Sequence, residues 1–215
     1  MAGLAEQRRR MVERQLRRRG IGDERVLAAM AAVPREEFVP ADQRGRAYAD
    51  SALPIGEGQT ISQPWIVAAI CQALELRGEE RVLEVGSGSG YSTAVLARLA
   101  AAVVGIERHE PLAAAARRRL DRLGVENVEL LVGDGSRGLP RRAPFEAIAV
   151  HATAPAPPRT LFGQLADGGR LVVPIATGSA DLLTVFRRQG DELRREEIGF
   201  CRFVPLVGEE GFDPD

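Results

Sequence analysis

The sequence predicts an α/β protein with a doubly wound, mostly parallel sheet, an N-terminal helical extension and a C-terminal antiparallel hairpin. Three observations carry this prediction. Short apolar strands alternate with helices from residue 81 onward, which is typical of βαβ units. A turn with three alternate glycines joins the first of these strands to a helix. After Gly178, two neighbouring strand candidates follow each other across a short turn.

Each element of the core can be assigned in order. Strands are expected over five apolar stretches, at residues 81–85, 102–106, 128–132, 145–150 and 170–175. Helices are expected between them, at residues 91–101, 111–123 and 159–166. Strands at residues 182–186 and 197–203, joined across Gln189, Gly190 and Asp191, are expected to form the hairpin.

The N-terminal residues 1–63 are expected to join residues 64–215 in one domain, because the chain is short for two. Helices are expected within residues 1–40, and the first of them carries seven arginines against two glutamates. A nucleic-acid or membrane arm is one interpretation of this charge. A solvated helix face is the preferred one, because most charge runs are solvated.

Residues 41–63 show no periodic apolar pattern and are predicted to be a long loop, which in a compact domain is usually functional. Pro64 is expected to open a helix that Gly78 closes.

Composition excludes several classes of protein. No stretch approaches the roughly 18 apolar residues of a membrane-spanning helix, and the charged N-terminus does not resemble a signal peptide, so a cytoplasmic location is expected. The 215-residue chain has a net charge of −1, so general affinity for nucleic acid is not expected, and its size favours a monomer. Cys71 and Cys201 are expected to be buried free thiols, because two distant cysteines form no disulfide framework or zinc motif.

The glycine turn, VLEVGSGSG at residues 82–90, is the most informative motif. Glycines such as Gly86 and Gly88 have no Cβ atom. The chain can therefore turn tightly here, and its backbone can approach a ligand closely. The spacing is GxGxG rather than the GxGxxG of dinucleotide sites, because Tyr91 stands where the third glycine would be. Glu84, just before the turn, would repel a pyrophosphate but suits a ligand with an ammonium group, such as S-adenosylmethionine.

Two more acidic residues follow strand ends. Glu107 lies 21 residues after Gly86, the spacing at which a carboxylate binds ribose hydroxyls. Asp134, beside Gly135, could accept a hydrogen bond from the adenine amino group. Acids at three successive strand ends, where open sheets bind their ligands, predict a Rossmann-like methyltransferase that uses S-adenosyl-L-methionine.

Four motifs resemble those of the protein-L-isoaspartate O-methyltransferases: DSALPIGEGQTISQP at residues 50–64, EVGSGSGY at 84–91, VGDG at 132–135 and FVPL at 203–206. The resemblance spans nearly the whole chain. It implies a repair enzyme that methylates the free α-carboxylate of L-isoaspartyl residues in damaged proteins and peptides. The ester then closes to a succinimide, which can hydrolyse to aspartate.

The resemblance also implies roles for particular residues. Ser62 corresponds to the active-site serine, and Gln59, Thr60 and Ile61 would line the methyl donor with it. Phe203, Val204, Pro205 and Leu206 would flank the substrate peptide. Because the acceptor carboxylate is already ionised at pH 7, no general base is required, and Ser62 would serve to orient it.

The two histidines are expected to be peripheral. His109 is predicted to be a surface residue. His151 stands where the family usually has threonine, and we expect it to belong to the supporting shell, although direct contact with substrate is the alternative. Neither histidine lies in a ligand-spaced motif, so no metal site is expected.

Two other functions remain open from the residues. A methyltransferase acting on RNA or a small molecule would be favoured by a basic cleft or an Asn-Pro-Pro motif, where this chain has HATAP at residues 151–155. A binding module without turnover would be expected to lack Ser62 or one of the three acids.

Overall fold

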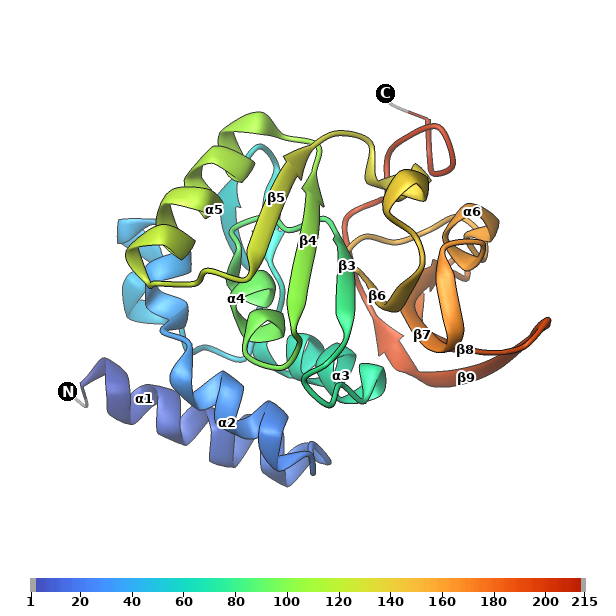
Figure 1. The fold of residues 1–215 in the computed structure, drawn as a ribbon. Helices are drawn as coiled ribbons and strands as arrows, with labels where there is room; N and C mark the ends of the chain where they lie inside the picture. The colour runs from blue at the N-terminus through green and yellow to red at the C-terminus, as the bar shows by residue number, and fades with distance from the viewer. Residues whose placement is uncertain (1–2, 214–215) are drawn as a thin grey trace.

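The computed structural model describes residues 3–213. Its centre is a seven-stranded sheet with the order β5-β4-β3-β6-β7-β8-β9, and a separate two-stranded sheet pairs β1 with β2 (Figure 1). The strands are β1 (Leu53–Gly56), β2 (Gln59–Ile61), β3 (Arg81–Val85), β4 (Ala102–Glu107), β5 (Val128–Val132), β6 (Phe145–Val150), β7 (Leu165–Ala176), β8 (Asp181–Gln189) and β9 (Glu192–Cys201).

The helices connect the parallel strands and build the N-terminal extension. The α-helices are α1 (Leu4–Met11), α2 (Glu24–Ala32), α3 (Pro64–Leu74), α4 (Tyr91–Ala97), α5 (Glu110–Arg122) and α6 (Arg159–Phe162). Short π or 3-10 segments are η1 (Val12–Leu16), η2 (Arg17–Arg19), η3 (Arg35–Phe38), η4 (Ala41–Arg46), η5 (Gly135–Arg137) and η6 (Pro140–Arg142).

The predicted fold class is confirmed. Strands β3 to β7 pair in parallel, whereas β8 pairs antiparallel with both β7 and β9. This hairpin turns tightly at Gly190, which has a φ of 61°. The strands of the hairpin are longer than predicted. The added part of β9 is charged from Glu192 to Glu197, and it can pair as a strand because β9 lies at the sheet edge, where these side chains remain exposed to solvent.

Side chains alternate between the two faces of the sheet, as a strand period of two requires. Val82, Ala147 and Val172 pack in a cluster with α3, α4, α5 and the N-terminal helices. Their strand neighbours Leu83 and Ile148 pack on the opposite face with α6 and with the C-terminal segment, residues 202–213, which follows β9. Residues 11–61 contribute side chains to the first of these clusters, so the extension shares the core of the sheet.

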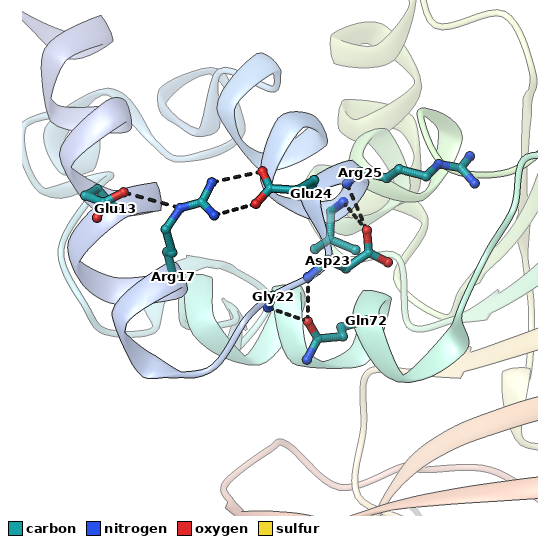
Figure 2. A network of polar contacts seen from close by, with 8 residues as sticks. Glu13, Arg17, Gly22, Asp23, Glu24, Arg25 and Gln72 are labelled. Carbon is teal, nitrogen blue, oxygen red and sulfur yellow. Dashed lines mark hydrogen bonds and ion pairs between the residues drawn. The ribbon is translucent and has the colours of Figure 1, made fainter.

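A polar network attaches the extension to α3 (Figure 2). Gln72 of α3 accepts hydrogen bonds from the backbone amides of Gly22 and Asp23, at 2.8 and 3.0 Å. Arg17 contacts Glu13 and Glu24, so part of the basic charge is paired within the extension.

Asp23 caps the N-terminus of α2, because its carboxylate accepts from the amides of Arg25 and Val26. Replacing Asp23 with alanine is expected to lower the free energy of unfolding by about 1 kcal/mol, the usual contribution of such a cap. Urea denaturation tests this, with Asp42→Ala as the control, because among residues 3–213 the side chain of exposed Asp42 forms a hydrogen bond only with neighbouring Gln43. Equal stability of the two variants would contradict the prediction.

The segment at residues 41–63 was predicted to be loop, and this is partly wrong. It contains η4 and the β1–β2 hairpin, in which Leu53 pairs with Ile61. The turn depends on left-handed backbone at Gly56 and Gly58, with φ of 101° and 67°. Leu53 and Ile55 alternate with exposed residues, but the pattern is too short, and too interrupted by Pro54, to indicate a strand.

Smaller differences concern helix ends and one cysteine. The α4 helix ends at Ala97 and α6 at Phe162, both earlier than predicted, because the chain must turn back to begin the next strand. Cys71 is buried as predicted, but Cys201 is only half-buried, because it lies at the end of edge strand β9. Within residues 3–213, no helix is long and apolar enough to cross a membrane.

Candidate active site

The glycine turn between β3 and α4 is built as the sequence predicts. Gly86, Gly88 and Gly90 all have positive φ, at 85°, 53° and 88°. An L side chain would be strained at each position. The amide of Gly86 donates to the carbonyl of Ile106 at the end of β4, which fixes the turn at the carboxyl edge of the sheet.

A cleft with about 760 Å³ of empty space, part of it open to solvent, lies over this edge, and we call it the inner cleft. It is bordered by the glycine turn, the ends of β4 and β6, the β2–α3 connection and the C-terminal segment. Its lining residues are Gln59, Thr60, Ile61, Ser62, Val67, Val85, Gly86, Ser87, Gly88, Ser89, Tyr91, Ser92, Ile106, Glu107, Arg108, His109, Gly135, His151, Ala152, Val204, Pro205, Leu206 and Val207. The cleft thus brings together eleven of the fourteen predicted site residues; Glu84, Asp134 and Phe203 are not in its lining.

Glu107 is the carboxylate that the structure places in the inner cleft. It is 4% exposed, and its two oxygens accept hydrogen bonds from the amides of Gly88 and His109, at 2.8 and 2.9 Å. These bonds tie the glycine turn to the end of β4. A contact between Glu107 and a ribose stays a prediction, but the position suits it.

Glu84 lies beneath the glycine turn, on the face of β3 that also carries Val82. Its carboxylate is fully buried and accepts hydrogen bonds from the hydroxyls of Ser92 and Thr93. Burial alone would raise the pKa of Glu84, but the contact with His151 and these two hydroxyls hold the pKa below its usual value. Contact with a ligand's ammonium group stays a prediction, and the geometry offers none directly.

Asp134 is directed at the C-terminal segment. Its oxygens accept from the amide and hydroxyl of Ser136 and from the amide of Glu209, at 2.7–2.9 Å. A Cβ on Gly208 would lie 2.0 Å from an Asp134 oxygen, so the segment can approach this closely only with glycine there. A contact of Asp134 with adenine stays a prediction.

The pKa of Asp134 is lowered, because hydrogen bonds from Ser136 and Glu209 outweigh the opposing effect of burial. A lowered folded-state pKa stabilises the fold above the unfolded value of about 3.9, and this contribution is lost as pH falls through the folded value. We expect hydrogen exchange at the Glu209 amide, corrected for intrinsic rates, to accelerate below about pH 4.

The variant Asp134→Ala should show this faster exchange already at pH 7, because the acceptor is gone. Asp167→Ala is the matched control, since Asp167 also accepts backbone hydrogen bonds but holds Gly168 and Gly190 instead. Protection of Glu209 that is unchanged in Asp134→Ala would contradict the assignment.

Ser62 lies between the inner cleft and a second cavity of about 810 Å³, which we call the outer groove. The outer groove is lined by Arg19, Ala52, Thr60, Ser62, Gln63, Trp65, Ile66, His151, Phe200, Cys201, Arg202, Phe203 and Val204. The lining that both cavities share consists of Thr60, Ser62, His151 and Val204. A group transferred from one cavity to the other would therefore pass these side chains.

The hydroxyl of Ser62 is free for a ligand, because it has no hydrogen bond within residues 3–213. Buried Ile61 and Pro64 hold the chain on either side of it. Next to it, Gln63 donates to the carboxylate of Asp50 at 2.6 Å. Ser62 therefore lies in a segment that contacts with its neighbours hold in place.

Both histidines line the cavities of the site. His109 lines the inner cleft and is half-buried, although it was predicted to be a surface residue. His151 lines both cavities, and its assignment to the supporting shell, like the alternative of contact with substrate, stays a prediction. Both follow strand ends at the ligand-binding edge, and this is the signal that could have identified them.

Comparison with known proteins agrees with this arrangement. The family described as Protein-L-isoaspartate(D-aspartate) O-methyltransferase matches residues 6–211. A protein-L-isoaspartate O-methyltransferase of Koribacter versatilis is 51% identical over 214 residues, which cover 100% of this chain and 96% of the relative. One from Roseiflexus castenholzii is 54% identical, covering 95% of this chain and 94% of the relative.

The chain belongs to the protein-L-isoaspartate O-methyltransferase family. A solved protein-L-isoaspartate O-methyltransferase has a TM-score of 0.85 and 32% identity, covering 95% of this chain and 67% of the solved one. A Plasmodium falciparum structure described with the same activity contains S-adenosyl-L-homocysteine. It has a TM-score of 0.82 and 25% identity, covering 96% of this chain and 99% of the other. The family resemblance predicted from the motifs is confirmed.

The inner cleft fits the methyl donor of this family. Gly135 forms part of its lining, and a Cβ there would lie 2.6 Å from the side chain of Val85. The turn at Gly86 and Gly88 leaves backbone close to any ligand, and Glu107 supplies one anionic acceptor. Within residues 3–213 no cluster of three His, Cys, Asp or Glu side chains could bind a metal.

Proposed function

We propose that this protein transfers a methyl group from S-adenosyl-L-methionine to the free α-carboxylate of L-isoaspartyl residues in damaged proteins and peptides. The methyl ester can then close to a succinimide, whose hydrolysis returns part of the residue to aspartate. The observation that carries the proposal is the junction at Ser62 between the inner cleft and the outer groove. Membership of the family supports the reaction itself.

S-adenosyl-L-methionine supplies a methyl group activated by its sulfonium. One acceptor oxygen forms the new bond to carbon while the bond from carbon to sulfur breaks, and the electron pair stays on sulfur. No proton moves in this step, because the acceptor is already a carboxylate at neutral pH. The protein therefore has to align the reacting atoms and exclude water, and such positioning can lower the barrier by several kcal/mol.

Different residues bind the donor and orient the acceptor. Glu107 and the glycine turn bind the donor in the inner cleft, with Gln59, Thr60 and Ile61 along its wall. Ser62 donates a hydrogen bond to one acceptor oxygen, so that the other oxygen faces the methyl group. Val204, Pro205 and Leu206 flank the polypeptide beside the acceptor.

The test uses a synthetic peptide that contains a single L-isoaspartyl residue, together with its L-aspartyl isomer. After incubation with S-adenosyl-L-methionine, mass spectrometry is expected to show one added methyl group on the isoaspartyl peptide only. Methylation of RNA or of a small metabolite, with neither peptide modified, would support the rival methyltransferase function. Binding of the donor without any transfer would indicate a binding module.

No metal takes part in the proposed reaction. Methyl transfer to the isoaspartyl peptide is therefore expected to continue at an unchanged rate in the presence of EDTA. Loss of activity that a divalent ion restores would contradict this prediction.

We further propose that the protein acts as a monomer in the cytoplasm, without a nucleic-acid or membrane partner. A monomer gives the outer groove free access to a polypeptide. Light scattering at the concentration used for the assays tests the oligomeric state, and a dimer would contradict this part of the proposal.

A further inference from the structure

His151 occupies the position immediately after β6, next to the central strand β3. Its backbone amide donates to the carbonyl of Val85 at 2.9 Å, so the residue is fixed relative to the glycine turn. It is 9% exposed, and it lines both the inner cleft and the outer groove. Of the side chains shared by the two cavities, it is the one that can become a cation.

Glu84 lies directly behind this ring. The Nε2 atom of His151 is 3.3 Å from the Oε1 atom of Glu84, and both atoms belong to side chains with at most 6% exposure. The Glu84 carboxylate accepts its hydrogen bonds from the hydroxyls of Ser92 and Thr93, and the buried Nε2 atom of His151 has no hydrogen-bond partner within residues 3–213. A buried carboxylate needs such partners, and an ionised one favours a proton on the ring nitrogen that faces it.

We propose that His151 is a second residue that binds the acceptor carboxylate, and that Glu84 is a positioning residue that holds its ring. This inference rests on the proposed function and deepens it. With Nε2 directed at Glu84, Nδ1 is the nitrogen available to a group at the junction. Ser62 and His151 would then hold the acceptor from two directions, and the buried Glu84 would serve the acceptor site.

Among the described residues, no other ionisable side chain lies at the junction. The other charged or titratable side chains that line the two cavities are Arg19, Tyr91, Glu107, Arg108, His109, Cys201 and Arg202, and each of them lines only one cavity. His151 is therefore the ionisable side chain placed to contact an acceptor carboxylate at the junction.

The experiment measures peptide binding by calorimetry, with the protein saturated with S-adenosyl-L-homocysteine. The variant His151→Asn is expected to bind the isoaspartyl peptide about ten- to a hundredfold more weakly than wild type, and His151→Ala at least as weakly. Ser51→Ala is the control, because Ser51 lines neither cavity, and its affinity for the peptide should equal that of wild type.

Kinetics provide the second measurement. KM for the peptide is expected to rise about ten- to a hundredfold in His151→Asn and at least as much in His151→Ala, because a hydrogen bond to a charged group is lost. Affinity for S-adenosyl-L-homocysteine should change less than about twofold in His151→Asn, which also shows that this variant is folded. A loss of packing alone would not raise KM for the peptide while sparing this affinity.

Two results would overturn the inference: a wild-type KM for the peptide in His151→Asn, or an equally large loss of affinity for S-adenosyl-L-homocysteine in that variant. The proposed function would still stand in either case, provided that wild type methylates the isoaspartyl peptide. Failure of wild type to methylate that peptide would instead reject the proposed function.

Discussion

Replacement of Ser62 by alanine is expected to lower turnover about ten- to a hundredfold. The hydroxyl donates one hydrogen bond to a charged acceptor, which corresponds to about 1.5–3 kcal/mol when it matters fully in the transition state. Ser62 lies where the two cavities meet, so its loss affects orientation of the acceptor more than binding of the donor. Single-turnover kinetics at saturating cofactor measure the rate, and calorimetry measures affinity for S-adenosyl-L-homocysteine.

The matched control is Ser51→Ala. Ser51 precedes Ser62 in the same segment, and its buried hydroxyl has no hydrogen-bond partner within the described residues 3–213, so turnover should be unchanged. A loss of donor affinity that parallels the loss of turnover in Ser62→Ala would assign this serine to donor binding instead.

Replacement of Glu107 by alanine is expected to weaken binding of S-adenosyl-L-homocysteine by about 1–3 kcal/mol, or about five- to 150-fold in Kd. The variant removes the proposed ribose acceptor and also leaves the amides of Gly88 and His109 without their partner. The fold should survive, because the backbone hydrogen bonds of β4 to both neighbouring strands do not depend on this side chain.

Glu129→Ala is the control for Glu107→Ala. Glu129 is an exposed carboxylate on neighbouring β5, where it contacts Arg142 outside the inner cleft. Calorimetric titration is expected to show wild-type affinity for this control. An unchanged affinity in Glu107→Ala would exclude the ribose role.

The sequence allowed close prediction of the central strands. Predicted bounds for β3, β5 and β6 match the structure, because each is a short apolar run followed by a change to polar residues or glycine. The glycine turn at residues 86–90 was equally clear, since alternate glycines have few other uses. The β1–β2 hairpin was missed because its pairing depends on contacts of Leu53 and Ile55 with the core rather than on a local pattern.

The direction of side chains at the site was harder to predict than their position. Because side chains alternate along β3, Glu84 lies on the same face of the sheet as Val82, beneath the glycine turn. Its absence from the lining of the inner cleft could therefore have been predicted. The contact of Asp134 with Glu209 could not, because 75 residues separate them in the sequence. The proposed role of His151 depends on its contact with Glu84 of β3, whereas its position after β6 indicates only that it lies at the ligand-binding edge.

Catalysis by positioning, without a general base, is tested most directly by turnover as a function of pH for wild type and Ser62→Ala at saturating cofactor and peptide. If Ser62 only orients a carboxylate, the ratio of the two rates should stay constant between about pH 6 and 8, since neither group changes protonation there. A rate that rises through a titration near neutrality in wild type, and loses that rise in Ser62→Ala, would contradict positioning and indicate a base acting through the serine.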